Sequence, residues 1–521
     1  MSEEITTTEN TKEELYPENP WLSSLPVLLS VFIFVLDGTI ANVALPHMAG
    51  SFSATRDESI WILTSYLIAS GIVIPTVDWF SKLLGRKNFY IISVLLFTIA
   101  SLLCGMATSL GAMIAARILQ GFGGGGIVPL SQAIMIESFP KEKRAQGMAA
   151  FGMGVILAPI LGPVIGGWIT DNWSWPWIYF INVPFGCLAA IMCHKFLWNP
   201  PYARRQKGVK IDGWGFLFLV IWIAALQVVL DKGNNSDWFH APWVCWTFLV
   251  SCIAGVAFFI SQKRGKNPLI DLSVFKDINF LAGTAIQIVM QGVLFASIAI
   301  LPQYLQSMMG YTAYLSGQSM MPRGLGSLIA MAIIGKISNK VNNKLLVVIG
   351  LTMIGSSSLS LGFLNLQIAS IDIMIPNFFM GMGLGLTMIP IINLSVDTLK
   401  NEQMTNASGV QNLLKTIGGA VGTSLVATFL SRFAQMHQYM MVGKLSMLNP
   451  VFVERFQTIG GAFAKYTSPD MAQYMSQYMM YRQLIQQSTL WAFMDAFRIF
   501  GLACFVIIPL LLFIKANKVN D

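Results

Sequence analysis

The residues of this sequence best suited to chemistry are charged side chains inside long apolar segments. Asp37 lies within residues 22–45 and Arg117 within residues 112–136. A charge at the centre of a membrane-spanning helix costs about 3 kcal/mol on insertion scales, so it usually faces a bundle interior or a cavity. At about 1.5 Å per residue, Asp37 lies about 12 Å and Arg117 about 9 Å below the outer ends of their segments. We therefore expect the two side chains at a similar depth.

A carboxylate beside an arginine can bind and release a proton when the surroundings of the arginine change. Asp37 and Arg117 are therefore our candidates for proton coupling, and a fixed ion pair that never titrates is the alternative. Asn42 and Gln120 lie on the same two segments and are candidates for substrate binding or coupling.

Two further cations, Arg323 and Lys415, lie near the middle of apolar segments in the second half of the chain. They could hold an anionic head group, oppose a proton on a carboxylate, or pair with Asn and Gln, and their cost in a membrane argues for a role in substrate binding or coupling. Asp495 and Arg498 are three residues apart on one predicted helix, so we interpret them as a structural pair that neutralises itself.

Several other chemistries lack their residues. The glycines at 123–126 lie inside an apolar segment with no preceding strand and no P-loop lysine, which argues against nucleotide binding. The four histidines have no ligand spacing, and the six cysteines lie in apolar segments, as small buried hydrophobes do. A lipid-modifying enzyme would need clustered His, Asp or Glu, and a receptor would normally carry a soluble output domain. We therefore expect no metal, no cofactor and no enzymatic activity.

The elements that must position these residues are transmembrane helices. The chain has 521 residues, of which 55% are hydrophobic and 11% charged, whereas soluble proteins average about 25% charged residues. A helix needs about 20 mostly apolar residues to cross a bilayer. Fourteen segments satisfy this length: 22–45, 59–80, 88–107, 112–136, 145–169, 176–196, 212–231, 242–262, 280–302, 313–335, 345–366, 372–396, 406–430 and 491–514. The sequence therefore predicts an all-α integral membrane protein embedded in lipid.

The positive charges fall into clusters between these segments. The formal net charge is +8, and Lys and Arg gather near residues 82–87, 141–144, 204–210 and 263–266. Such clusters mark cytoplasmic loops. We therefore predict that both termini lie in the cytoplasm, and the charge requires no nucleic-acid partner.

The two ends of the chain resemble each other. Gly124, Pro129, Glu137 and Ala145-x-Gly147 correspond to Gly385, Pro390, Asp397 and Ala407-x-Gly409. Duplicated bundles are typical of transporters, although chance similarity between glycine-rich segments is the alternative. The predicted units are a tail at 1–21, a six-helix bundle at 22–197, a linker with two extra helices at 198–265, five helices of a second bundle at 266–430, a periplasmic loop at 431–490, and the last helix with a cytoplasmic tail at 491–521.

Four motifs in order resemble one family. They are Leu36-Asp-Gly-Thr-Ile-Ala-Asn-Val-Ala-Leu-Pro46, Ala115-Ala-Arg-Ile-Leu-Gln-Gly-Phe-Gly-Gly-Gly-Gly126, Leu157-Ala-Pro-Ile-Leu-Gly-Pro-Val-Ile-Gly-Gly-Trp168 and Trp175-Pro-Trp-Ile-Tyr-Phe-Ile-Asn-Val-Pro-Phe-Gly186. The chain resembles the fourteen-span drug:proton antiporters of the major facilitator superfamily, EmrB type, over most of residues 22–430. It departs from the family pattern at Asp78 and Lys82, where Gly and Asp are usual, and at Lys415, where Arg is often found.

The resemblance implies a fold of two six-helix bundles with two inserted helices and a proton-driven antiporter that exports lipophilic drugs or toxic small molecules by alternating access. It also implies a location in the bacterial inner membrane, with a periplasmic EmrA-like adaptor and an outer-membrane channel as partners. A proton-coupled carrier for one specific metabolite or siderophore is the alternative.

Gating residues follow from the same motifs. Glu137 and Asp397 end the fourth and twelfth segments, and we expect them to pair with Arg86 or Lys87 and with Lys340 or Lys344, either as a latch for one access state or as solvated helix ends. In the fifth segment the antiporter motif contains prolines that kink a helix and glycines that allow close packing: Pro159, Gly162, Pro163, Gly166 and Gly167.

The loop at 431–490 is rich in Met, Gln and Tyr. Met471, Met475 and Met479 recur at four-residue spacing, which predicts an amphipathic helix. Methionine surfaces adapt to varied partners, so the loop is either a dock for the adaptor or a lid over the outer opening.

Overall fold

The computed structural model describes residues 17–140, 143–206, 212–265, 268–311, 313–337 and 341–514. In these residues every regular element is a helix, which confirms the all-α prediction. The first half contains α2 (Pro20–Ser51), α3 (Arg56–Ser59), α4 (Trp61–Val73), α5 (Val77–Leu84), α6 (Arg86–Gly105), α7 (Leu110–Gly124), α8 (Ile127–Ser138), α9 (Arg144–Asn172), α10 (Trp177–Phe180) and α11 (Asn182–Phe196). Two helices follow, α12 (Gly213–Lys232) and α13 (Pro242–Arg264). The second half contains α14 (Ile278–Ser307), α15 (Ala313–Ile337), α16 (Asn343–Leu361), α17 (Ser370–Val396), α18 (Met404–Val442), α19 (Pro450–Phe463) and α20 (Pro469–Ile507).

The helices are long and apolar because the sequence supplies membrane-length hydrophobic segments. Among the described residues, twelve helices or helix pairs are long and apolar enough to cross a membrane, and α9 brings the number to thirteen if it is one bent span. The remaining predicted segment is α15, which has 25 residues. The chain is therefore a multi-pass membrane protein, and this count is consistent with fourteen spans without confirming them.

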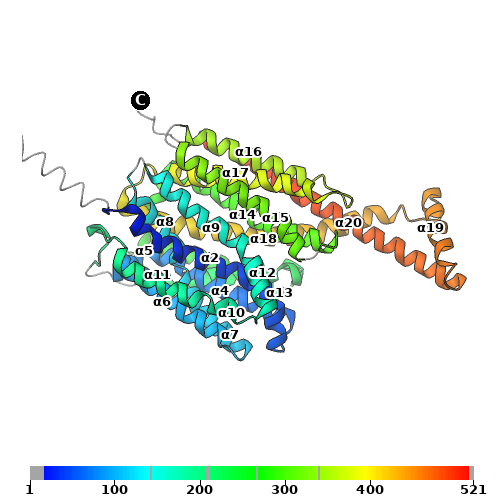
Figure 1. The fold of residues 1–521 in the computed structure, drawn as a ribbon, viewed down its shortest axis with the longest axis horizontal. Helices are drawn as coiled ribbons and strands as arrows, with labels where there is room; N and C mark the ends of the chain where they lie inside the picture. The colour runs from blue at the N-terminus through cyan, green and yellow to red at the C-terminus, as the bar shows by residue number, and fades with distance from the viewer. Residues whose placement is uncertain are drawn as a thin grey trace, which may run out of the picture.

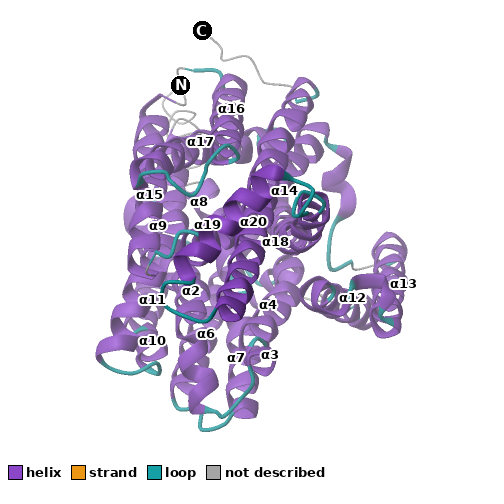
Figure 2. Ribbon diagram, turned by 90° about the vertical axis from the view of Figure 1, so that its right-hand side faces the viewer, coloured by secondary structure: helices purple, strands orange, loops and turns teal. Residues whose placement is uncertain are grey.

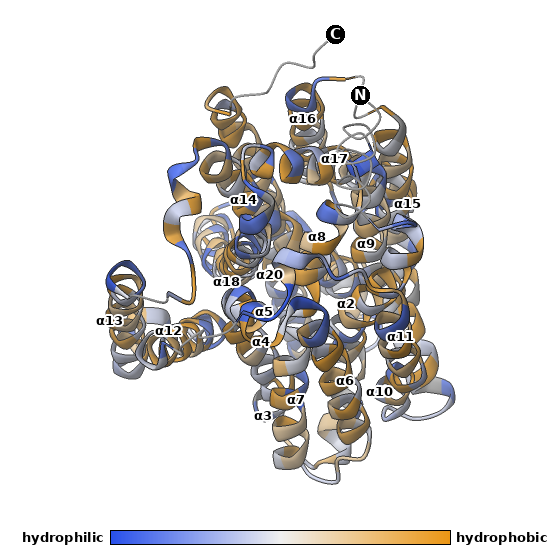
Figure 3. Ribbon diagram, turned by 90° about the vertical axis from the view of Figure 1, so that its left-hand side faces the viewer, coloured by the Kyte–Doolittle hydropathy of each residue, from blue (hydrophilic) through white to orange (hydrophobic). Residues whose placement is uncertain are grey.

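The two inserted helices lie beside the rest of the structure. Figures 2 and 3 show α12 and α13 next to each other at one side, with α12 nearer to α4 and α18. Only 22% and 28% of their most apolar windows are buried within the protein. Because such apolar surface is unfavourable in water, these helices require lipid around them.

A helical hairpin extends beyond one end of the bundle. The helices α18 and α20 have 39 residues each, and their outer parts form a projection with α19 (Figure 1). We call this end of the bundle the hairpin end. The opposite end, where α2 begins and α20 finishes, is the termini end; Figure 3 views it directly and shows hydrophilic segments around α5 and α11.

Among the described residues, the two halves share a hydrophobic core towards the termini end. One core cluster combines residues of α2, α6 and α8 with residues of α15 and α17, including Ile136, Phe139, Ile334 and Ile392. Towards the hairpin end, one cluster around Met48 and Met113 contains residues of the first half, and another around Leu301 and Phe497 contains residues of the second half. The described side chains therefore pack the halves together at the termini end and pack each half separately at the hairpin end.

Candidate functional site

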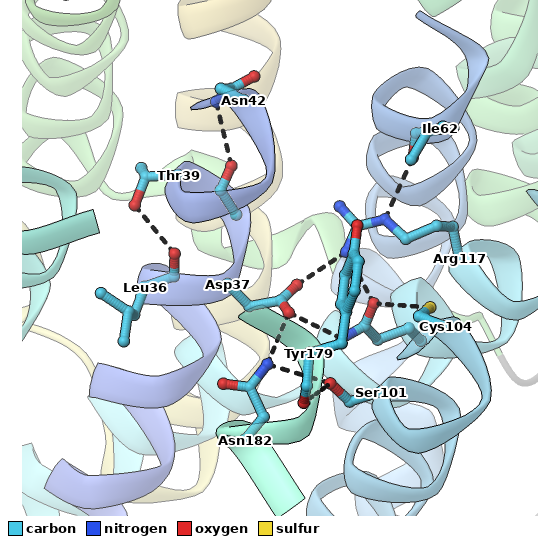
Figure 4. Close-up of polar contacts among 12 residues, drawn as sticks. Leu36, Asp37, Thr39, Asn42, Ile62, Ser101, Cys104, Arg117, Tyr179 and Asn182 are labelled. Carbon is cyan, nitrogen blue, oxygen red and sulfur yellow. Dashed lines mark hydrogen bonds and ion pairs between the residues drawn. The ribbon is translucent and has the colours of Figure 1, made fainter. Parts of the chain in front are cut away.

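The central feature of the first half is a fully buried ion pair. Asp37 on α2 and Arg117 on α7 both have no exposed surface, and Arg117 Nη1 lies 2.8 Å from Asp37 Oδ2 (Figure 4). The sequence placed both residues at a similar depth, and the fold brings them into contact.

Two amides complete the surroundings of the Asp37 carboxylate. Gln120 Nε2 donates to Asp37 Oδ1 at 3.0 Å, and Asn182 Nδ2 donates to the same oxygen at 2.7 Å (Figure 4). Asn182 also donates to Ser101 Oγ at 3.0 Å, and that hydroxyl donates to the backbone carbonyl of Tyr179 at 2.9 Å. The carboxylate thus accepts hydrogen bonds from α7 and α11 as well as its ion pair.

Arg117 is held by more than its carboxylate. Its Nε donates to the Ile62 carbonyl at 3.1 Å, and its Nη1 donates to Gln120 Oε1 at 2.7 Å. The guanidinium carbon lies 4.1 Å from the ring centre of Tyr66 and 5.6 Å from that of Tyr179, within the range of cation–π attraction. Nη2 has no hydrogen-bond partner among the described residues, so the guanidinium keeps one group available to a new partner.

This arrangement links a proton to the contacts of an arginine. A buried pair is stabilised by mutual attraction, and removing one charge leaves the other costly to bury. Protonation of Asp37 would remove the charge that balances Arg117, so Arg117 would gain from contacts elsewhere or from water. The site can therefore exchange a proton for a change in helix packing.

The predicted antiporter motif on α9 packs against α2 at the residues that follow Asp37. In α9 a Cβ at Gly162 would overlap the side chain of Thr39, and a Cβ at Gly166 would lie 2.6 Å from Ile40 Cγ1. The two parts of α9, which end at Pro159 and begin again after Pro163, meet at 40°. The predicted close approach and kink are both observed, and Gly167 follows on the same helix. Both contacts fall on the α2 turn that follows Asp37.

The structure does not bring Asn42 into this site. Its exposed side chain donates to the Gly38 carbonyl of its own helix at 3.3 Å and points away from Asp37 (Figure 4). The sequence analysis instead missed Asn182 as a site residue, although it lies in the fourth motif. Helix phase could have indicated the first point, because five residues turn a side chain by about 140° around the helix.

The second half holds an arginine without an acidic partner among the described residues. Arg323 on α15 is 5% exposed; its Nε and Nη2 donate to Asn377 Oδ1 at 3.1 and 2.8 Å, and its Nη1 donates to Ser297 Oγ at 3.0 Å. Lys415 on α18 is partly buried and forms no ion pair with any described residue. Arg323 therefore keeps its charge among neutral groups.

The predicted pair at Glu137 forms with Arg86. Arg86 Nη1 lies 2.6 Å from Glu137 Oε2, and their side chains are 4% and 1% exposed. Tyr202, in the linker after α11, donates its hydroxyl to the same carboxylate oxygen. Burial, then the nearby carboxylate, raises the pKa of Tyr202 far above its usual range, so this hydroxyl remains a donor. Lys87 does not share this ion pair.

The second predicted pair extends beyond the described residues and stays a prediction. Asp397 is exposed at the end of α17, and Lys340 lies outside the described residues.

Asp495 and Arg498 do pair at 3.0 Å as expected, and His437 of α18 joins them with Nε2 2.8 Å from Asp495 Oδ2. No group of three or more His, Cys, Asp or Glu within the described part is placed to hold a metal ion.

The chain is similar in sequence and in fold to known membrane proteins. The family model of the Major Facilitator Superfamily matches residues 27–423. The probable multidrug resistance protein EmrY of Escherichia coli (strain K12) is 34% identical over 85% of this chain and 87% of its own length. The fatty acid resistance protein FarB of Neisseria gonorrhoeae is 34% identical over 80% of this chain and 82% of its own length. The crystal structure of the human organic anion transporter MFSD10 aligns with a TM-score of 0.62 over 95% of this chain and 99% of that one, and its 13% identity supports the fold alone.

Proposed function

This chain belongs to the Major Facilitator Superfamily, and we propose that it exports lipophilic drugs or toxic small molecules by alternating access, driven by protons that enter in exchange. The observation that carries the proposal is the fully buried Asp37–Arg117 pair. The similarity of this chain to a multidrug resistance protein, over most of both chains, supports drug efflux as the activity. As in the family, the proton gradient would supply the energy, with no bound cofactor.

In the proposed cycle, Asp37 takes up a proton from the hairpin end and releases it at the termini end. The shared core at the termini end and the separate cores at the hairpin end support a state that is closed towards the termini end. Protonation weakens the hold of Asp37 on Arg117, and α2 packs against the bent helix α9. Binding of substrate in the other state would favour release of the proton.

The proposed location is the bacterial inner membrane with both termini in the cytoplasm, which places the hairpin in the periplasm. A periplasmic adaptor of the EmrA type, leading to an outer-membrane channel, is the proposed partner of the hairpin. The supporting observation is a row of exposed residues on α20: Met471, Tyr474, Met475, Tyr478, Met479 and Tyr481. The water-facing side of a helix normally carries more polar residues than this row does, and Met and Tyr are enriched in protein–protein interfaces.

Arg323 is the proposed contact for acidic groups of substrates. Its guanidinium is buried among neutral partners, and a buried charge without a counterion is costly. An anionic amphipathic molecule would supply that counterion when bound. The name of FarB, a fatty acid resistance protein, is consistent with such a substrate. Lys415 on α18 is a second candidate.

A proton-coupled carrier for one metabolite or siderophore remains the second candidate, since the same coupling pair could serve it. No observation in the described residues favours it over drug export.

Transport into proteoliposomes with an imposed pH gradient tests the proposal. Wild-type protein should move lipophilic dyes only when the gradient is present, and Asp37→Asn should abolish this movement while the protein stays folded. Asn42→Asp, which adds a carboxylate on the exposed side of the same helix, is the matched control and should leave Asp37 working. Undiminished gradient-driven transport by Asp37→Asn would exclude Asp37 as the coupling residue.

A further inference from the structure

A set of buried amides joins the two halves directly at the termini end. Gln132 on α8 donates through Nε2 to Gln411 Oε1 on α18 at 3.2 Å, and Asn412 Nδ2 donates to Gln132 Oε1 at 2.9 Å. Gln132 thus acts as donor to one residue of the second half and as acceptor from the next. Gln132 and Gln411 have no exposed surface, and Asn412 is 6% exposed.

The same hydrogen bonds continue into the second half. Gln411 Nε2 donates to Ser395 Oγ on α17 at 2.7 Å, and Gln287 Nε2 on α14 donates to the same hydroxyl at 3.5 Å. We call Gln132, Gln287, Ser395, Gln411 and Asn412 the amide layer. It connects four helices from both halves, and each of the two central glutamines uses both ends of its amide.

The amide layer lies between the Asp37–Arg117 site and the termini end. Gln132 follows Arg117 along the α7–α8 span, about 20 Å nearer the termini end by helix rise. It adjoins the apolar core that both halves share, which includes Leu130, Ile134 and Met135 of the same helix. Lys415 lies one helical turn after Gln411 on α18, nearer the hairpin end. A proton coming from the termini end would have to cross this layer and pass a cation.

The Arg86–Glu137 pair cannot perform this task, because α6 and α8 both belong to the first half. Tyr202, the third member, belongs to the linker next to the first half. The Arg86–Glu137 pair therefore lies within one half, whereas the amide layer spans the two.

We propose that the amide layer is the proton-tight gate of the transporter, which closes the route from the termini end to Asp37 and opens once in each transport cycle. The proposal rests on the proposed function of proton-driven alternating access. Amides do not titrate between the pH values of the two compartments, so the closed layer offers no carrier for a proton. They also suit repeated opening, because water replaces each broken hydrogen bond and no bare charge is left behind.

Gln132→Ala removes both hydrogen bonds that Gln132 makes to the second half. Two such bonds correspond to about a tenfold change in the ratio of open to closed gate. We expect passive proton leak into vesicles that hold a pH-sensitive dye, measured without any drug, to rise by about tenfold. Gln227→Ala is the matched control, because it removes an amide hydrogen bond to Asp231 within α12 and none of the bonds of the amide layer. Leak at the wild-type rate in folded Gln132→Ala protein would overturn the proposal.

A cysteine pair tests the gate without depending on the stability of Gln132→Ala. In a chain whose six native cysteines are replaced by serine, Gln132→Cys with Gln411→Cys should form a disulfide on oxidation. The disulfide should stop gradient-driven export, and a reductant should restore it. Each single cysteine variant is the control for the oxidant. If the fully cross-linked protein exports as fast as the same protein after reduction of its disulfide, the gate is overturned and the proposed function stays intact. If the wild type exports nothing under any gradient, the proposed function is overturned. The leak assay would then still decide on the gate.

Discussion

The Arg86–Glu137 pair offers a prediction whose size follows from burial. Both side chains are at least 96% buried, as their exposures of 4% and 1% show, so little solvent screening weakens the interaction. Glu137→Gln leaves the Arg86 guanidinium buried without a counterion, which costs about 3–5 kcal/mol. Tyr202→Phe removes one hydrogen bond to a charged acceptor, which costs about 1.5–3 kcal/mol.

The double variant gives the sharper result. Arg86→Gln combined with Glu137→Gln removes both charges together, so it should destabilise the protein less than the sum of the single variants, by about 0.5–3 kcal/mol. Equilibrium unfolding in mixed micelles measures all four members of this cycle. Proton-driven turnover, measured where every variant is folded, then separates a latch from a brace. A latch that opens in each cycle should change turnover, and a fixed brace should leave it unchanged.

Additive costs of the two single variants would refute the coupling, and so would a cost of Glu137→Gln below about 1 kcal/mol. Either result would mean that water or another group compensates Arg86, contrary to the buried contact between Arg86 and Glu137.

Two further predictions concern substrate charge and the hairpin. Arg323→Gln should weaken binding of a carboxylate-bearing amphiphile by about tenfold, equal to about 1.4 kcal/mol, and should leave its uncharged alcohol analogue unaffected, as equilibrium binding in nanodiscs would measure. Met475→Asp together with Tyr478→Asp should preserve transport in proteoliposomes, because an exposed face of α20 is changed, but should abolish adaptor-dependent drug resistance in cells.

Each of these has its own control. Lys263→Gln removes an exposed cation at the end of α13 and should leave binding of both amphiphiles unchanged; equal losses for the acid and the alcohol in Arg323→Gln would argue for a structural role. Val451→Asp, at an exposed residue of α19, is the control for the α20 double variant and should leave adaptor-dependent resistance unchanged. Loss of transport in proteoliposomes by the α20 variant would favour a lid over the outer opening.

Sequence patterns were sufficient where one helix or one motif carries the information. Asp37 and Arg117 could be matched in depth because helix rise is constant, and the glycines near 162–166 could be assigned to close packing because a missing side chain has few other uses in an apolar helix. Asn42 was a weaker choice, since its position on α2 points it away from Asp37.

The sequence by itself determined that this chain is a helical membrane protein with charges at its centre, because hydrophobic length and the cost of burying charge act locally. Tertiary structure alone decided which polar groups meet. Asn182 reaches Asp37 across 145 residues and Gln132 reaches Gln411 across 279. Amides carry no charge and are common in apolar helices, so their partners become known only when the packing of two halves fixes which helix faces lie together.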